Sequence, residues 1–149
     1  MLGRTYDREN CSAARALEIV GERWSLLIIR NAMFAGATRF TEFQRGLGVA
    51  PNILSSRLEL LVEAGLMQRH MSGPGDSPHY VLTSKGLDLQ PVIISLSAWG
   101  DRWAAPDGPP ILYVHDRCGG AIRQELRCAA CGAAPEPAQV KGLPGPGMP

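Results

Sequence analysis

The chain has 149 residues, of which 45% are hydrophobic and 19% are charged. That length suits one domain, or one domain with a small appendage, and the composition is that of a folded globule, not of a disordered chain. Lys and Arg total 15 against 14 Asp and Glu, a formal net charge of +1. A uniformly basic surface is therefore excluded, and any binding of a polyanion must come from local placement of charge.

Two features bear on location and on the use of cysteine. No apolar run approaches the roughly 18–20 residues that span a bilayer, so we expect no membrane-spanning helix. The first ten residues are polar and lack the hydrophobic stretch of a secretory signal, which predicts a cytoplasmic protein. In such a protein, the 4 cysteines indicate metal ligands or reactive thiols more than structural disulfides.

Composition divides the chain into three parts. Residues 11–109 carry nearly all of the helical periodicity, residues 110–134 hold three of the cysteines, and residues 135–149 are rich in Pro and Gly. Turn-forming residues at 105–110 indicate a linker between the first two parts. We expect the last part to be disordered, because it has too little apolar surface to order itself.

Apolar residues at helical spacing predict helices over residues 11–20, about 23–34, about 38–45 and 51–64. Asn10 and Thr38 are suitable N-caps, and Pro51 occupies the first helical position that proline prefers. A short third helix, a glycine turn at 46–48 and a fourth helix directly after it are typical of a helix-turn-helix.

Two strand-like segments, 66–70 and 79–82, flank a loop dense in turn-forming residues. We expect a β-hairpin directly after the fourth helix, the place of the wing in a winged helix-turn-helix. Thr83 should cap one last long helix to residue 103, with a kink at Pro91. The predicted fold class is thus mainly α with a small hairpin wing (α+β), a winged helix-turn-helix with a short C-terminal zinc-knuckle-like hairpin.

A helix-turn-helix binds DNA by placing its second helix in the major groove. Polar residues near the start of the fourth predicted helix are candidates for base contacts: Asn52, Ser55, Ser56 and Arg57. Further arginines are candidates for phosphate contacts: Arg39, Arg45 and Arg69. Six arginines and three acidic residues between positions 23 and 70 concentrate positive charge where DNA would lie. The alternative is that these are ordinary solvated polar residues.

Residues 11–104 resemble the HxlR-type family of bacterial winged-helix transcriptional regulators, relatives of the MarR group. The resemblance is carried, in the family's order, by Cys11, residues 21–24 (GERW), 26–30 (LLIIR), Gly36, 39–43 (RFTEF), 51–61 (PNILSSRLELL), 64–66 (AGL), 80–86 (YVLTSKG) and 99–100 (WG). Ala50 departs from it, because the family commonly has Ser at this cap. Ala weakens the cap by about 1 kcal/mol. The resemblance implies a homodimeric repressor or activator that binds an inverted-repeat operator.

The last predicted helix carries apolar side chains at steps of three and four residues, including Val92, Leu96, Trp99 and Trp103. A stripe this apolar at the edge of a small domain needs a cover. We interpret it as a dimerisation surface for a second copy of the chain. The alternative is that it packs on the chain's own N-terminal helix.

Cys11 lies at the first position expected for the first helix. A helix N-terminus favours the thiolate and raises its reactivity. The resemblance implies a sensing role, since a cysteine at this place serves some family members as an electrophile or oxidant sensor. The alternative is a small buried hydrophobic residue. The inducer itself is unknown from the sequence.

Two segments of the C-terminal part, 115–119 and 128–132, share the form ligand-x-x-Cys-Gly. Together they offer four ligands to one structural zinc ion per chain: His115, Cys118, Cys128 and Cys131. The pair resembles zinc-ribbon knuckles. The alternatives are a metal-free hairpin with free thiols and a redox dithiol made by the last two cysteines.

The sequence contains no nucleophile–base arrangement, phosphate-binding loop or dinucleotide motif, so we predict that the protein is not an enzyme. An alternative function from another class is a winged-helix protein-interaction module that uses the zinc knuckle as its contact surface. The salt dependence of DNA affinity separates the two, because only phosphate neutralisation makes binding steeply salt-dependent.

Overall fold

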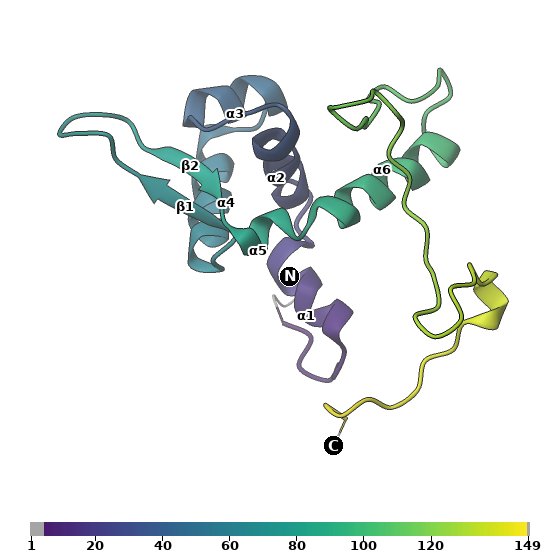
Figure 1. Ribbon diagram of the computed structural model, residues 1–149. Coiled ribbons are helices and arrows are strands. Elements are labelled where there is room, and N and C mark those ends of the chain that lie inside the picture. Colours follow the sequence, from purple (N-terminus) through teal and green to yellow (C-terminus); the bar gives the residue numbers. More distant parts are fainter. Residues whose placement is uncertain (1–4, 149) are drawn as a thin grey trace. The chain divides into compact units, whose positions relative to one another are not determined.

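The computed structural model describes residues 5–148 (Figure 1). Its internal contacts divide the chain into two units, Met1–Ile93 and Ile94–Pro149. Two expectations extend outside the described residues: the absence of a secretory signal includes residues 1–4, and the disordered C-terminus includes residue 149. Within residues 5–148, no helix has the length and apolar character needed to cross a membrane.

The elements in chain order are α1 (Ser12–Val20), α2 (Ser25–Phe34), α3 (Phe40–Leu47), α4 (Pro51–Glu63), β1 (Met67–His70), β2 (His79–Leu82), α5 (Ser84–Leu87), α6 (Gln90–Trp103) and the single 3-10 turn η1 (Pro137–Gln139). The predicted order of two helices, a helix-turn-helix and a hairpin is confirmed. The short turn η1 lies in the Pro- and Gly-rich segment.

The core of the first unit lies where α2, α3, α4 and the hairpin meet. Its fully buried large side chains are Ile28, Ile29, Phe43, Leu54, Leu58, Leu61 and Met67. Helix α4 contributes three of them at steps of four and three residues, so one face of the helix is fixed inward. This packing determines which side of α4 is left to solvent.

The hairpin predicted as a wing is present. Strands β1 and β2 pair antiparallel with Met67 opposite Leu82, and the loop between them extends beyond the sheet (Figure 1). The backbone N–H of Tyr80 donates to the carbonyl of Thr38 at 2.7 Å. This bond ties the hairpin to the segment that leads into α3.

Helix starts differ from prediction by one or two residues. Cys11, not Asn10, is the N-cap of α1, so the helix begins one residue later. Arg39, not Thr38, is the N-cap of α3. The Glu42 carboxylate explains the second shift, because it accepts hydrogen bonds from the backbone N–H groups at both positions before the helix. Helix α2 likewise begins two residues later than predicted.

The prediction of a single long helix after Thr83 is wrong. Thr83 does cap a helix, because its hydroxyl accepts a hydrogen bond from the Gly86 N–H at 3.2 Å. However, α5 ends at Leu87 and α6 begins at Gln90. Pro91 accounts for the break, since a proline has no N–H to donate and is tolerated only in the first turn of a helix.

Helix α4 begins without a side-chain cap, because its N-cap residue is the exposed Ala50. We expect Ala50→Ser to raise the free energy of unfolding by about 0.5–2 kcal/mol, because a hydroxyl here can accept from the free N–H groups of the first turn. Equilibrium urea denaturation measures the change. Ala13→Ser, at an exposed position inside α1, is the matched control and should bring no gain. Equal midpoints for Ala50→Ser and the unmodified chain would contradict this account of the cap.

Candidate nucleic-acid interface

Helices α3 and α4 form the predicted helix-turn-helix. Helix α3 continues through Leu47, two residues past its predicted end, and Gly48 follows it with a φ of 63°. Glycine is the residue that adopts this left-handed conformation without strain. Only residues 48–50 separate the two helices, and Val49 among them is buried. The direction of α4 is therefore fixed by a short, anchored turn.

The polar residues at the start of α4 lie on the side away from the core. Asn52 and Ser55 are exposed, and Ser56 is partly buried. Leu54 and Leu58, on the opposite side, are completely buried. Asn52 and Ser55 are therefore placed where a helix needs polar side chains to approach base edges in a major groove.

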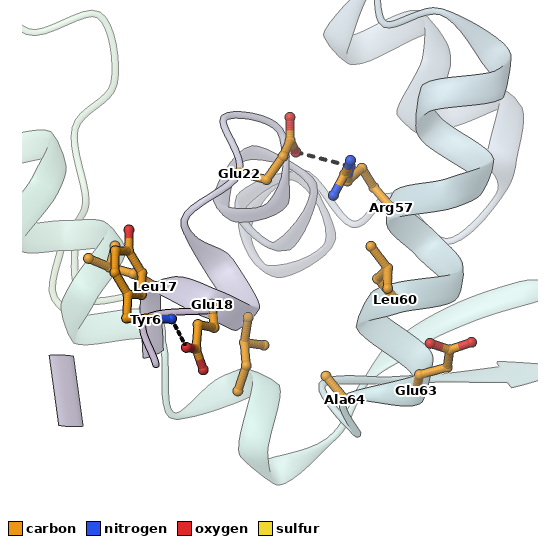
Figure 2. A pocket seen from close by; sticks show the side chains of 9 residues that line it. Tyr6, Leu17, Glu18, Glu22, Arg57, Leu60, Glu63 and Ala64 are labelled. Carbon is orange, nitrogen blue, oxygen red and sulfur yellow. Dashed lines mark hydrogen bonds and ion pairs between the residues drawn. The ribbon is translucent and has the colours of Figure 1, made fainter. Parts of the chain in front are cut away.

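Arg57 departs from its expected placement. Its side chain is only 23% exposed, and its Nε lies 3.3 Å from a carboxylate oxygen of Glu22. Figure 2 shows this ion pair, which joins the turn after α1 to the middle of α4. The Nε is buried and makes no aligned hydrogen bond. Arg57 therefore packs on the side of α4 that faces the turn after α1, and its side chain does not extend from the solvent-exposed side of the helix.

A cavity of about 550 Å³ lies between α1 and α4, beside this ion pair (Figure 2). Its charged lining consists of three carboxylates, Glu18, Glu22 and Glu63, and a single arginine, Arg57. An acidic lining repels phosphate, so this side of α4 is excluded as the DNA-facing surface. The exposed polar side, with Asn52, remains the candidate interface.

The three arginines predicted to contact phosphate differ in their placement. Arg45, in the last turn of α3, and Arg69, on β1, are exposed. Arg39 is partly buried, and its Nη1 donates to the carbonyl of Ser77 at 2.7 Å. Arg39 therefore holds the loop of the hairpin, whereas the other two are accessible to a phosphate backbone.

Glu42 stabilises the start of α3. Its carboxylate accepts from the backbone N–H of Thr38 at 2.8 Å and of Arg39 at 2.9 Å. These donors hold the pKa of the Glu42 carboxyl below its usual value, because they favour the ionised form. The stabilisation is present above the unfolded pKa and is lost as pH falls through the lowered folded pKa.

The apolar stripe of α6 is exposed. The exposed fractions are 46% for Val92, 53% for Leu96, 63% for Trp99 and 65% for Trp103. On the other side of the helix, Ile93 and Ile94 are buried. Within residues 90–103, burial is thus confined to these two residues near the start of α6, and the apolar stripe is open to solvent.

The predicted redox and metal residues are all accessible. Cys11 is exposed and free at the N-cap of α1, so the alternative of a small buried residue is wrong. Cys118, Cys128 and Cys131 are also exposed and free. Across residues 5–148, no three His, Cys, Asp or Glu side chains are grouped closely enough to hold a metal ion. The four predicted zinc ligands are therefore not gathered into one site.

Two contributors to this region were missed from the sequence. Glu42 follows the N-cap of α3 by three residues, which is the spacing of a capping box and was available as a signal. Glu22 carries no comparable local signal, because its partner Arg57 lies 35 positions further along the chain. Only the packing of α4 against the α1–α2 turn brings that pair together.

Residues 19–108 match the family model described as HxlR-like helix-turn-helix. The chain belongs to this family, and it is a transcriptional regulator of the winged-helix class. An HTH-type transcriptional regulator of Mycobacterium tuberculosis, Rv3095, is 45% identical over 94% of this chain and 89% of its own. The structure of PA1607, a proposed transcription factor, has a TM-score of 0.83 at 36% identity and covers 92% of this chain and 96% of its own.

Solved relatives differ in how much of this chain they match. The reduced form of the transcriptional regulator YodB from Bacillus subtilis has a TM-score of 0.54 at 29% identity, over 66% of this chain and 98% of YodB. A match over 92% of this chain, as with PA1607, must extend well past residue 108. PA1607 thus has a counterpart of the C-terminal segment. In contrast, two thirds of this chain are enough to match nearly all of YodB.

Proposed function

We propose that the protein is a cytoplasmic, homodimeric regulator that binds an inverted-repeat operator, with one helix α4 in the major groove of each half-site. The observation that carries the proposal is the placement of α4. Its apolar face is buried in the core, and Asn52 and Ser55 are exposed on the other side. Membership of the HxlR-like family supports the same role. We propose no enzymatic activity.

Each residue near the interface has a separate proposed task. The residues that would face DNA are Asn52, Ser55 and Ser56 for base edges, and Arg45 and Arg69 for phosphates. Arg39 would act indirectly, because its bond to the Ser77 carbonyl sets the position of the hairpin loop. Arg57 would also act indirectly, because its ion pair with Glu22 fixes α4 against the helix pair behind it.

The exposed stripe on α6 supports the homodimer. It is defined by Val92, Leu96, Trp99 and Trp103. A tryptophan buries about 150–250 Å² when it is covered, so two per chain would account for much of a dimer interface. A second copy of the chain would set the two α4 helices about 34 Å apart, which is one turn of the DNA helix.

The salt dependence of DNA binding tests this function. Each copy of the dimer would neutralise phosphates through Arg45 and Arg69, so log K should fall steeply with log salt. We expect Arg45→Gln and Arg69→Gln each to reduce that slope by about two, one phosphate per copy. Fluorescence anisotropy across a salt series measures it. Arg123→Gln, an exposed arginine of the C-terminal segment, is the control. No affinity for DNA at low salt would contradict the proposal and favour a protein-interaction module.

We further propose that modification of Cys11 regulates DNA binding. Its thiol is exposed at the N-cap of α1. Among the structural relatives, YodB has been solved reduced and after diamide treatment, and HypR is described as a redox regulator. A quinone forms a covalent bond to a thiolate sulfur, which adds bulk at this exposed position.

We expect a quinone to weaken operator binding by at least about tenfold in the unmodified chain, an effect of roughly 1.4 kcal/mol. The response should be lost in Cys11→Ser and kept in Cys131→Ser, which removes a different exposed thiol. Anisotropy before and after treatment measures it. Equal release of DNA by the Cys11→Ser protein would show that the sensor is elsewhere.

A further inference from the structure

The second unit contains two turns with the same local geometry, the first turn at residues 115–119 and the second turn at residues 128–132. Each ends on a glycine in the left-handed region, with φ of 69° at Gly119 and 72° at Gly132. In each, the glycine N–H donates to the carbonyl of the first residue, at 2.7 Å in the first turn and 2.8 Å in the second. The repeated motif in the sequence is therefore a repeated structure.

Each turn brings its two potential ligand atoms together. In the first turn, Nδ1 of His115 lies 3.3 Å from Sγ of Cys118. In the second, the backbone N–H groups of Cys131 and Ala130 and the thiol of Cys131 donate hydrogen bonds to the sulfur of Cys128. The sulfur atoms of Cys128 and Cys131 therefore lie within hydrogen-bond reach of each other, as do the donor atoms of the first turn. Each turn thus supplies two of the four donor atoms that a tetrahedral metal site needs.

The segment that carries these turns has no core of its own. Of the described residues after 103, none is buried. A segment of this size without buried apolar side chains commonly needs a metal or a disulfide to hold its fold. The cysteines here are free, so a disulfide does not supply that restraint.

We propose that the first and second turns together bind one Zn²⁺ ion per chain, and that this ion closes the C-terminal segment into a folded unit. The donors are one imidazole nitrogen and three thiolate sulfurs, a set that suits zinc. They fill all four tetrahedral positions, so the site is structural and leaves no position for a reacting water. Nine residues separate Cys118 from Cys128. A segment of this length can span about 30 Å, so it is long enough to let the two pairs of ligands meet at one ion.

The metal content of the purified full-length protein tests this site without reference to DNA. Protein prepared without chelators or a histidine tag should contain about one zinc ion per chain by elemental analysis. Replacement by Co²⁺ should give the thiolate-to-cobalt charge-transfer band and the intense visible bands of tetrahedral coordination. The cobalt spectrum needs no variant, so it remains informative if a substitution unfolds the segment.

Cys118→Ser and Cys131→Ser, one in each turn, should each lose most of the bound zinc. Cys11→Ser removes a cysteine outside the turns and should keep the full amount, which makes it the matched control. Zinc below about 0.1 per chain in the unmodified protein, or an equal content in the three variants, would overturn the proposal. Isolation of a disulfide between Cys128 and Cys131 in place of the metal would also overturn it, in favour of a redox dithiol.

Discussion

Asn52→Ala should remove most of the sequence-specific affinity for operator DNA and leave the fold intact. Asn52 is exposed at the second position of α4, so its loss costs no core packing. A side chain that makes paired hydrogen bonds to one base contributes about 1–3 kcal/mol of discrimination. The proposed dimer would make two such contacts, so we expect a loss of about 30-fold or more. Anisotropy with the operator and with a scrambled duplex measures the difference.

Glu9→Gln is the matched control for that variant. Glu9 is exposed in the segment before α1, outside the helix-turn-helix and the hairpin. It should keep the operator affinity, while circular dichroism confirms that both variants are folded. Equal losses on operator and scrambled DNA would assign Asn52 to phosphate contact. Unchanged affinity on both duplexes would contradict the placement of α4 in the groove.

Trp99→Glu should convert the proposed dimer to monomer and, as a consequence, abolish tight operator binding. The side chain is 63% exposed in the single chain and lies in the middle of the α6 stripe. A tryptophan side chain that becomes covered removes about 150–250 Å² of its surface from water. Each Å² of apolar surface removed contributes roughly 25 cal/mol to the free energy of association. A carboxylate placed there twice in one interface should weaken association by at least about 100-fold. Light scattering coupled to size exclusion measures the mass in solution.

Met71→Glu is the control for this change, because it also places a carboxylate at an exposed apolar side chain, here in the hairpin loop. It should remain dimeric. A Trp99→Glu protein that is still dimeric at micromolar concentration would show that another surface holds the copies together. Loss of DNA binding without loss of the dimer would instead place Trp99 at the DNA.

Elements defined by local patterns were predicted well from the sequence. In α4, Pro51 marks the start, and the spacing of Leu54, Leu58 and Leu61 indicates the buried face, so start and face were both correct. The hairpin was also predictable, because its strands flank a segment dense in turn-forming residues. The break before Pro91 could have been inferred, since the proline should have been taken as a helix start and not as a kink.

Features that depend on distant residues were not predictable in this way. Arg57 was expected to face DNA because it follows two serines on a polar stretch. Its ion pair with Glu22 instead holds the side chain on the other side of α4. No local pattern joins those two positions. Arg39 likewise bonds to Ser77, 38 positions away. Both were arginines on a helix-turn-helix, and the charge count alone could not separate a supporting arginine from one that contacts phosphate.

Selection from a random pool of duplex oligonucleotides with the purified full-length protein tests the central claim most directly. If α4 of each copy lies in the major groove, the recovered sequences should share an inverted repeat. Its half-site centres should lie about one helical turn, or 34 Å, apart. Asn52→Ala should relax the preference at one position in each half-site. Recovery of sequences with no shared motif, or of a motif that Asn52→Ala leaves unchanged, would contradict the account.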